Sequence, residues 1–199
     1  SAQVVRTFHT SGQQAASWAL KTVADMLCKH DIKQVVIAGE GDGNHKVRRK
    51  YLSTYKSQRE EKDPVLVEQL KLFRECCWDI GWPVLRDMDL EADDVIATVV
   101  RAYSKAGTPC LIVGADKDLR QLLSLPGVSM FDAKQAGGFI TAEDVQKKFG
   151  VSCEQLCDFL AIMGDAGDGI PGVMGVGPVG AAKLLTDYKT LEKALDWAS

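Results

Sequence analysis

Seven carboxylates lie in three short segments of this chain, at residues 90–94, 114–118 and 164–168, each where a loop is predicted to meet a helix. Hard divalent cations take oxygen ligands, and two ions that hold a phosphate between them need several carboxylates close together. Such carboxylates repel one another unless cations neutralise them. The sequence therefore predicts a site for two Mg²⁺ or Mn²⁺ ions, formed by Glu91, Asp93, Asp94, Asp116, Asp118, Asp165 and Asp168.

Helix capping is the alternative interpretation for each of these acids taken alone. A carboxylate at the start of a helix accepts backbone N–H bonds and is favoured by the helix dipole. Asp116 is expected at an N-cap with Asp118 in the first turn, while Glu91 and Asp94 have the i, i+3 spacing of one helix face. Three clusters at the same end of a sheet favour a shared metal site over independent caps.

The densest basic stretch lies at residues 45–62 and contains two tyrosines, Tyr51 and Tyr55. Lysine and arginine neutralise phosphates, and tyrosine rings can stack on exposed bases. The alternative is a solvated helix face whose charges keep the protein soluble. The expected nucleic-acid contacts of this stretch are Lys46, Arg48, Arg49, Tyr55, Lys56 and Arg59.

A glycine-rich loop, at residues 164–177, begins with the third acid cluster. Its end matches a G-x-G-x-x-G pattern, but no strand precedes it, so a dinucleotide-binding fold is not favoured. The glycines would expose backbone N–H groups at the start of a helix expected at residues 178–185, where phosphate oxygens bind without sequence preference. A packing corner between two helices is the alternative. The DNA contacts expected here are Gly172, Gly175, Gly177 and Gly180.

Composition limits the other classes of site. The chain has 199 residues and a formal net charge of -3, which argues against a uniformly basic nucleic-acid coat but not against a nuclease. Its six cysteines form no C-x-x-C pair and indicate reduced thiols in an intracellular, reducing compartment. Cys153 and Cys157 have helical i, i+4 spacing, yet no second pair completes a zinc site. No apolar run of about 18 residues indicates a membrane segment.

Apolar periodicity predicts the elements that position these groups. Helices are expected at residues 13–30, 64–78 and about 91–106 and from residue 116 on, and strands at residues 34–38, 83–85, 110–113 and 128–131. This alternation predicts an α/β core with a mostly parallel central sheet and helices on both faces. Ligands bind beyond the carboxyl ends of such strands, where the first two acid clusters fall. We expect this core at residues 1–140 and a helical subdomain at residues 141–199.

Three motifs, in order along the chain, resemble the bacterial and phage 5'-nuclease family. That family includes flap endonucleases and the 5'-exonuclease domain of bacterial DNA polymerase I. The motifs lie at residues 90–96, 115–118 and 158–177. The family's basic arch, past which a single strand with a free 5' end runs, is matched at about residues 45–62 by Arg48, Tyr55, Lys56 and Arg59.

The resemblance implies a PIN-like core, a helix-hairpin (three-turn-helix) element that grips duplex DNA, and metal-dependent cleavage of DNA with 5' flaps or free 5' ends. By this resemblance Glu91, Asp93 and Asp94 serve a first metal ion. Asp116, Asp118, Asp165 and Asp168 serve a second. Arg48 and Lys56 would be catalytic groups that position the phosphate. A potassium ion at the glycine-rich hairpin, a monomeric state and a role in DNA replication and repair are further expectations.

Two departures from the family pattern concern the first metal site. Arg6 fits an arginine that follows the family's first Asp-Gly pair, which would place that aspartate upstream of Ser1. Ala38 stands where the family has a second aspartate, and Glu40 is the carboxylate that would have to replace it. We therefore expect binding of branched DNA with slow or absent cleavage. The alternatives are a catalytically inactive branched-DNA binder of the same fold and a phosphate-binding α/β domain unrelated to DNA.

Overall fold

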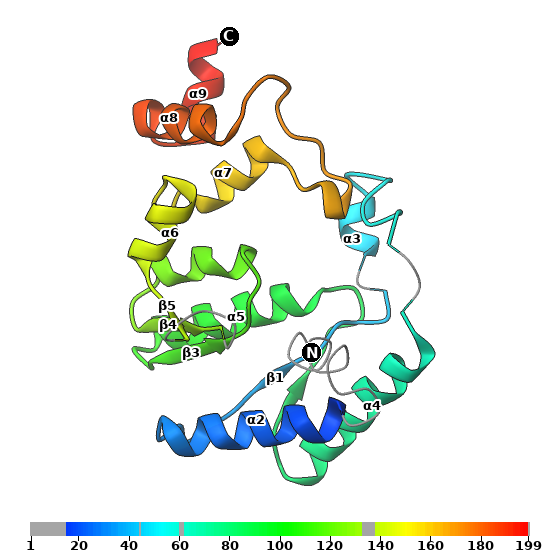
Figure 1. The fold of residues 1–199 in the computed structure, drawn as a ribbon. Coiled ribbons are helices and arrows are strands. Elements are labelled where there is room, and N and C mark those ends of the chain that lie inside the picture. The colour runs from blue at the N-terminus through cyan, green and yellow to red at the C-terminus, as the bar shows by residue number, and fades with distance from the viewer. Residues whose placement is uncertain (1–14, 44, 60–61, 133–137, 199) are drawn as a thin grey trace. The chain divides into compact units, whose positions relative to one another are not determined.

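The computed structural model describes residues 15–43, 45–59, 62–132 and 138–198 (Figure 1). Arg6 lies outside these residues. The chain divides into two compact units, one made of residues 1–47 and 60–96 and the other of residues 48–59 and 97–199. The predicted boundary near residue 141 falls within the second unit and stays a prediction. No helix among the described residues is both long and apolar enough to cross a membrane.

The first unit is built on two helices and a pair of short strands. α2 (Ala15–Lys29) and α4 (Pro64–Asp79) pack together around a core that includes Ala19, Leu70 and Phe73. α4 begins where it does because the Asp63 side chain accepts the Val65 N–H bond, and Pro64 needs no N–H partner at the first position. β1 (Ile37–Ala38) and β2 (Val84–Leu85) pair in parallel. The first turn of α5 (Ala92–Lys105) follows β2.

The second unit contains the longer strands. β3 (Cys110–Val113) pairs in parallel with β4 (Val128–Phe131), and β5 (Phe139–Ile140) pairs antiparallel with β4. The 3-10 helix η2 (Asp118–Ser124) connects β3 to β4. Because β3 and β4 are parallel, the chain must cross back over the sheet between them. The residues that follow β3 therefore lie at the carboxyl edge of the sheet, where ligands usually bind.

Helices alone make up the rest of the second unit. Figure 1 shows α6 (Ala142–Phe149), α7 (Leu156–Met163), the short η3 (Ala166–Asp168), α8 (Pro178–Tyr188) and α9 (Leu191–Ala198) in yellow to red. α6 opens with a capping box between Thr141 and Asp144 and ends at Gly150 in the left-handed conformation. Val145, Leu156, Phe159, Ala181 and Leu185 belong to the core that packs these helices together.

The structure differs from the sequence-based prediction in three places. The strand expected at residues 34–38 keeps only Ile37 and Ala38, and the described strands pair in one group of two and one group of three. The helix expected from Asp116 is a 3-10 helix that starts at Asp118. It is seven residues long and ends shortly before Pro126 and Gly127. β5 was not predicted, because two residues carry no periodicity; it is held by the edge-on packing of Phe139 on Phe131.

Candidate functional site

The first acid cluster lies in the loop between β2 and α5. The Gly41 N–H donates to Leu90 O at 3.1 Å, which ties this loop to the segment that follows β1. Glu91 is buried, and its Oε1 lies 3.0 Å from His45 Nδ1. Asp94 Oδ2 accepts the Glu91 backbone N–H at 3.1 Å, as a helix cap does. Asp93 shares the first turn of α5. In this conformation Asp94 caps a helix and Glu91 has a histidine partner.

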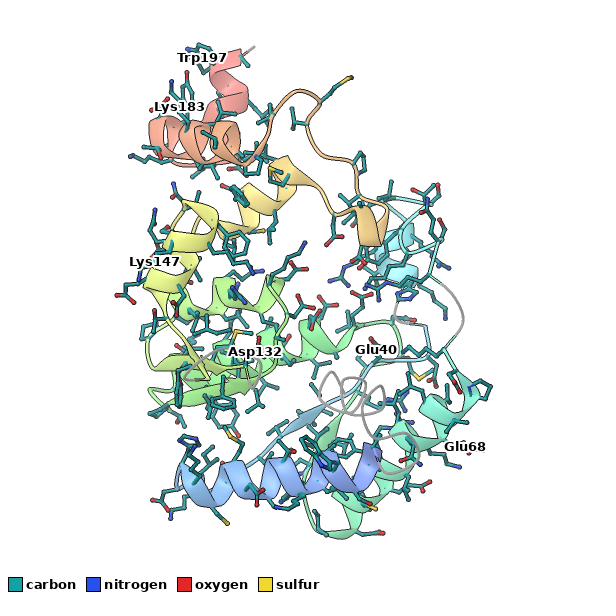
Figure 2. All side chains as sticks on the ribbon, viewed as in Figure 1. Glu40, Glu68, Asp132, Lys147, Lys183 and Trp197 are labelled. Carbon is teal, nitrogen blue, oxygen red and sulfur yellow. The ribbon has the colours of Figure 1, made fainter. Side chains whose placement is uncertain are left out.

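Glu40 lies on the segment that follows β1 (Figure 2). Its carboxylate pairs with Lys62, and its backbone oxygen accepts a bond of 2.8 Å from Arg86 Nε. Ala38 pairs with Leu85 in the strand ladder. Glu40 is therefore held by two cations of the same unit, and a metal ion that used it would have to displace Lys62.

The second acid cluster follows the carboxyl end of β3. Asp116 Oδ1 accepts the Asp118 backbone N–H at 3.0 Å. The residue at the N-cap of η2 is Lys117 and not Asp116 as predicted, because the helix begins at Asp118, one residue later than a cap at Asp116 requires. Burial raises the pKa of Asp118, and the charges of Asp116, Asp165 and Asp168 raise that pKa further. These carboxylates are thus close enough to repel one another.

Lys117 joins the second and third acid clusters. Its Nζ lies 2.8 Å from Asp165 Oδ2. This hydrogen bond lowers the pKa of Asp165 against the effect of burial, and it raises the pKa of Lys117. Asp165 also caps η3 by accepting the Gly167 N–H at 2.9 Å. Lys117, which the sequence analysis did not select, is therefore the cation that holds this carboxylate.

Asp168 lies against the basic stretch. Arg59 Nη2 donates to Asp168 Oδ1 at 2.6 Å, while Tyr55 Oη donates to Oδ2 at 3.3 Å. Lys56 Nζ lies 3.6 Å from Oδ2, and the Lys56 backbone N–H donates to Asp168 O at 2.9 Å. Figure 1 shows this stretch, in cyan, beside the orange turn of η3. Asp168 is thus satisfied by three side chains of residues 55–59.

The two tyrosines of the basic stretch differ in exposure. Tyr55, which we expected to contact DNA, is only 4% exposed, whereas Tyr51 is 89% exposed. The cations of Arg48 and Lys56 lie 5.9 and 5.0 Å from the centre of the Tyr55 ring. After α3 (Lys46–Arg49) the stretch consists of turns, so helical spacing does not predict which face is buried. In this conformation Tyr51 is the ring available to a base.

The remaining cations predicted in this stretch are also engaged. Lys46 Nζ lies 3.5 Å from Asp89 Oδ1, and Arg49 Nε donates to Tyr55 O at 3.1 Å. Neither partner was evident from the sequence. Asp89 is distant from Lys46 in the chain, and the bond of Arg49 to a backbone oxygen leaves no pattern in residue types. The exposed Lys50 also belongs to this stretch; Figure 2 shows two further exposed lysines of the second unit, Lys147 on α6 and Lys183 on α8, pointing outward.

The four glycines predicted to contact DNA fall into two kinds. A Cβ at Gly172 would lie 2.3 Å from Met163 O, so this glycine is required for packing. A Cβ at Gly180 would make an ordinary contact, at 3.4 Å, with Val176. Gly175 and Gly177 have open space beside them, and Gly177 caps α8 without a side-chain hydrogen bond. The hairpin tip carries Met174, which is 97% exposed.

The donor set suits a hard cation, although the described residues do not form a ready cage. No three His, Cys, Asp or Glu side chains among them are gathered so as to hold one ion. The carboxylates are instead compensated by Lys117, Lys56 and Arg59. The charges of Asp116, Asp165 and Asp168 all oppose ionisation of Asp118. A divalent ion bound beside Asp118 would relieve this repulsion.

Two family models match the chain. The 5'-3' exonuclease N-terminal resolvase-like domain matches residues 3–150, and the 5'-3' exonuclease C-terminal SAM fold matches residues 151–199. The match confirms the predicted fold class, a PIN-like α/β domain with a small parallel sheet and a helical C-terminal part.

Among curated proteins, the chain is 38% identical over 155 residues to DNA polymerase I of Rhizobium leguminosarum, covering 76% of this chain and 15% of that protein. It is 36% identical over 168 residues to flap endonuclease Xni of Shewanella loihica, covering 83% of this chain and 63% of that protein. The chain thus spans less than two thirds of these relatives' lengths.

Among solved structures, the D15 protein of T5 co-crystallized with metal ions has a TM-score of 0.86 at 22% identity, covering 98% of this chain and 75% of that one. A complex of the bacteriophage T5 D15 flap endonuclease with DNA and metal ions has a TM-score of 0.80 at 22% identity, with the same coverage of 98% and 75%. At this identity the likeness shows the fold.

Proposed function

Since this chain belongs to the 5'-3' exonuclease family, we propose that it hydrolyses phosphodiester bonds in DNA that carries a 5' flap or a free 5' end. The observation that carries the proposal is the concentration of carboxylates after β3 and α7: Asp116, Asp165 and Asp168 each raise the pKa of Asp118, and a divalent cation would relieve that repulsion. Sequence relatives named DNA polymerase I and flap endonuclease support the choice of DNA as substrate.

The metal assignment follows the clusters. Glu91, Asp93 and Asp94 would hold one Mg²⁺ or Mn²⁺ ion, and Asp116, Asp118, Asp165 and Asp168 a second. Bound divalent ions lower the pKa of a water and stabilise the leaving oxygen. Structures of the T5 protein with metal ions support this dependence. The protein would act as an intracellular monomer in DNA replication and repair.

The chain's own residues would bind and orient the DNA. Arg48 lies 5.9 Å from the centre of the Tyr55 ring, and Lys56, which is buried against Asp168, lies 5.0 Å from it, so a phosphate that reached this ring would meet both charges as negative charge develops on it. The backbone at Gly175 and Gly177, which has open space on the side where a Cβ would lie, would contact the duplex through its N–H groups irrespective of base sequence. A potassium ion among the carbonyls of this hairpin is part of the proposal.

A labelled 5'-flap substrate tests the proposal. Cleavage that requires Mg²⁺ and stops in EDTA is expected. The competing function is an inactive binder of branched DNA, and the Glu40 to Lys62 pair beside Ala38 favours it. Salt-sensitive binding of the flap in Ca²⁺ without any cleavage in Mg²⁺ or Mn²⁺ would support that second function. The absence of salt-sensitive binding to branched duplexes would exclude both.

A further inference from the structure

Asp168 binds the basic stretch with both of its carboxylate oxygens. Arg59 donates to Oδ1 at 2.6 Å, and Tyr55 donates to Oδ2 at 3.3 Å, with Lys56 Nζ 3.6 Å from that oxygen. The backbone contributes a further bond of 2.9 Å, from Lys56 N–H to Asp168 O. Residues 55–59 are thus fixed to one aspartate, 109 positions from Arg59 in the chain.

The backbone at Lys56 shows that this attachment costs conformational energy. Lys56 has φ of 51°, in the left-handed region that non-glycine residues seldom occupy. Such a conformation is strained for a residue with a side chain and persists only where the surrounding contacts hold it. Gly169 permits the close approach, since a Cβ there would lie 3.0 Å from Thr54 O. The Lys56 side chain is buried in the process.

The same aspartate belongs to the carboxylates that the proposed function gives to a divalent ion. Arg59 donates to Oδ1, while Tyr55 donates to Oδ2 and Lys56 Nζ lies 3.6 Å from Oδ2, so a divalent ion bound to either oxygen would lie close to both cations and repel them. The buried Lys56 ammonium, once displaced from Asp168, would be stabilised by a new anion, and the exposed Arg59 guanidinium could bind the same anion. A DNA phosphate is that anion.

We propose that Asp168 is a positioning residue which holds Lys56 and Arg59 against the 165–170 loop, and that a divalent ion competing for Asp168 releases both cations to single-stranded DNA. The inference rests on the proposed function, because it takes Asp168 as a metal ligand. By linkage, metal binding and single-strand binding strengthen each other.

Hydrogen exchange of residues 53–59, followed by mass spectrometry, tests the release without measuring cleavage. In EDTA we expect slow exchange of the Lys56 amide, and in saturating Mg²⁺ an exchange at least about 10-fold faster, since a bonded amide exchanges only on opening. Asp168→Asn should exchange rapidly in both conditions. The matched control is Asp165→Asn, which removes the same charge from the same loop but has Lys117 as its partner. It should keep the slow exchange in EDTA, because asparagine also caps η3.

The salt dependence of single-strand binding gives a readout that a purely structural role would not change. For wild type, adding Ca²⁺ should steepen the slope of log Kd against log salt by about 1.4, the contribution of two phosphate contacts at about 0.7 each. Asp168→Asn should show the steeper slope already in EDTA. Lys56→Ala combined with Arg59→Ala should show the shallower slope with or without Ca²⁺.

The outcomes separate the inference from the proposed function. Flap cleavage together with unchanged exchange of residues 53–59 in Mg²⁺ would overturn the inference alone. Slow exchange in Asp168→Asn would do the same. Failure to bind Mg²⁺ in calorimetry, with no cleavage, would overturn the proposed function and the metal competition together. If Asp165→Asn matched Asp168→Asn in both readouts, the effect would be one of charge and the positioning role would be lost.

Discussion

At the scale of single residues, the least expected feature is the buried Arg120 in η2. Its side chain is 6% exposed, and its Nε has no hydrogen-bond partner among the described residues. The guanidinium lies 5.9 Å from the Phe149 ring centre, a contact that offsets only part of the desolvation cost.

Arg120→Met should therefore raise the free energy of unfolding by about 1 kcal/mol, because it removes a poorly compensated buried charge while keeping the side chain's length. Urea unfolding measures this. Arg101→Met on α5 is the control, since Arg101 is exposed and its loss should leave stability unchanged. A loss of stability in Arg120→Met would mean that the guanidinium has a stronger partner than the Phe149 ring.

Ala38 tests the first metal site. Ala38→Asp should raise cleavage of a 5' flap on the order of 100-fold, because one missing electrostatic contact commonly costs that much in rate. DNA affinity in Ca²⁺ should change little. Glu40→Gln is the companion variant, because Glu40 is the other candidate carboxylate. If unmodified Ala38 protein already cuts at the rate of the Asp variant, and Glu40→Gln abolishes cutting, then Glu40 completes the site.

Asp165 gives a prediction for pH. Its pKa is lowered from 3.8, so its ionised form stabilises the fold above that pH, and this contribution is lost as the pH falls through the lower, folded pKa. Asp165→Asn should cost roughly 0.5–1 kcal/mol near pH 6, given a partly exposed pair. Urea midpoints of the two proteins should converge as the pH falls below 3.8. A constant difference across that range would contradict the role of Lys117.

At the scale of elements, the hairpin before α8 contains one glycine required for packing, Gly172, and others with open space beside them that would contact DNA. Gly177→Val should weaken binding of every duplex sequence alike, by about 10-fold, because the added side chain fills the open space beside the backbone that would contact phosphate. The φ of -90° at Gly177 admits valine, but valine is a poorer N-cap than glycine, so α8 should lose about 1 kcal/mol. Gly180→Ala is the matched control, expected to stabilise α8 by about 0.5–1 kcal/mol with unchanged affinity. Fluorescence anisotropy with several duplexes provides the measurement, and a loss confined to one sequence would contradict backbone recognition.

Elements with a clear period were predicted best. β3 and β4 have the predicted bounds because each is a short, largely apolar run, ended by Gly114 in one case and by Asp132 in the other. The 3-10 character of η2 could not be predicted, because the residues 118–124 also suit an α-helix. The pairing of Arg59 with Asp168 could not be predicted either, because the two residues are 109 positions apart in the chain and only the tertiary fold brings them together.

At the scale of the whole molecule, the repulsion of Asp116, Asp165 and Asp168 on Asp118 should make the thermal stability of the fold depend on bound metal. Asp118 is destabilised by burial and by its neighbours, so Asp118→Asn should raise the melting temperature in EDTA by about 2–4 °C, the effect of about 1 kcal/mol in a chain of this size. The rise in melting temperature on adding Mg²⁺ should shrink in the same variant. Differential scanning calorimetry measures both, and an unchanged Mg²⁺ response would remove Asp118 from the metal site.

The site was predicted in its residue types more than in its contacts. Carboxylates after β2 and β3 follow from the rule that ligands bind at the carboxyl ends of strands. The groups that hold Asp165, Glu91 and Glu40 are Lys117, His45 and Lys62, and these come from positions whose role depends on tertiary contacts. A single sequence therefore specifies the acids but not the side chains that hold them.

The pairing of Lys117 with Asp165 has a consequence for biosynthesis. A structural zinc domain cannot fold until its metal arrives, because the metal supplies the folding free energy. Here a lysine of the same chain already neutralises the carboxylate, at 2.8 Å, and joins the loop after β3 to the loop after α7. The contact between these two loops can therefore form during biosynthesis without a bound magnesium ion.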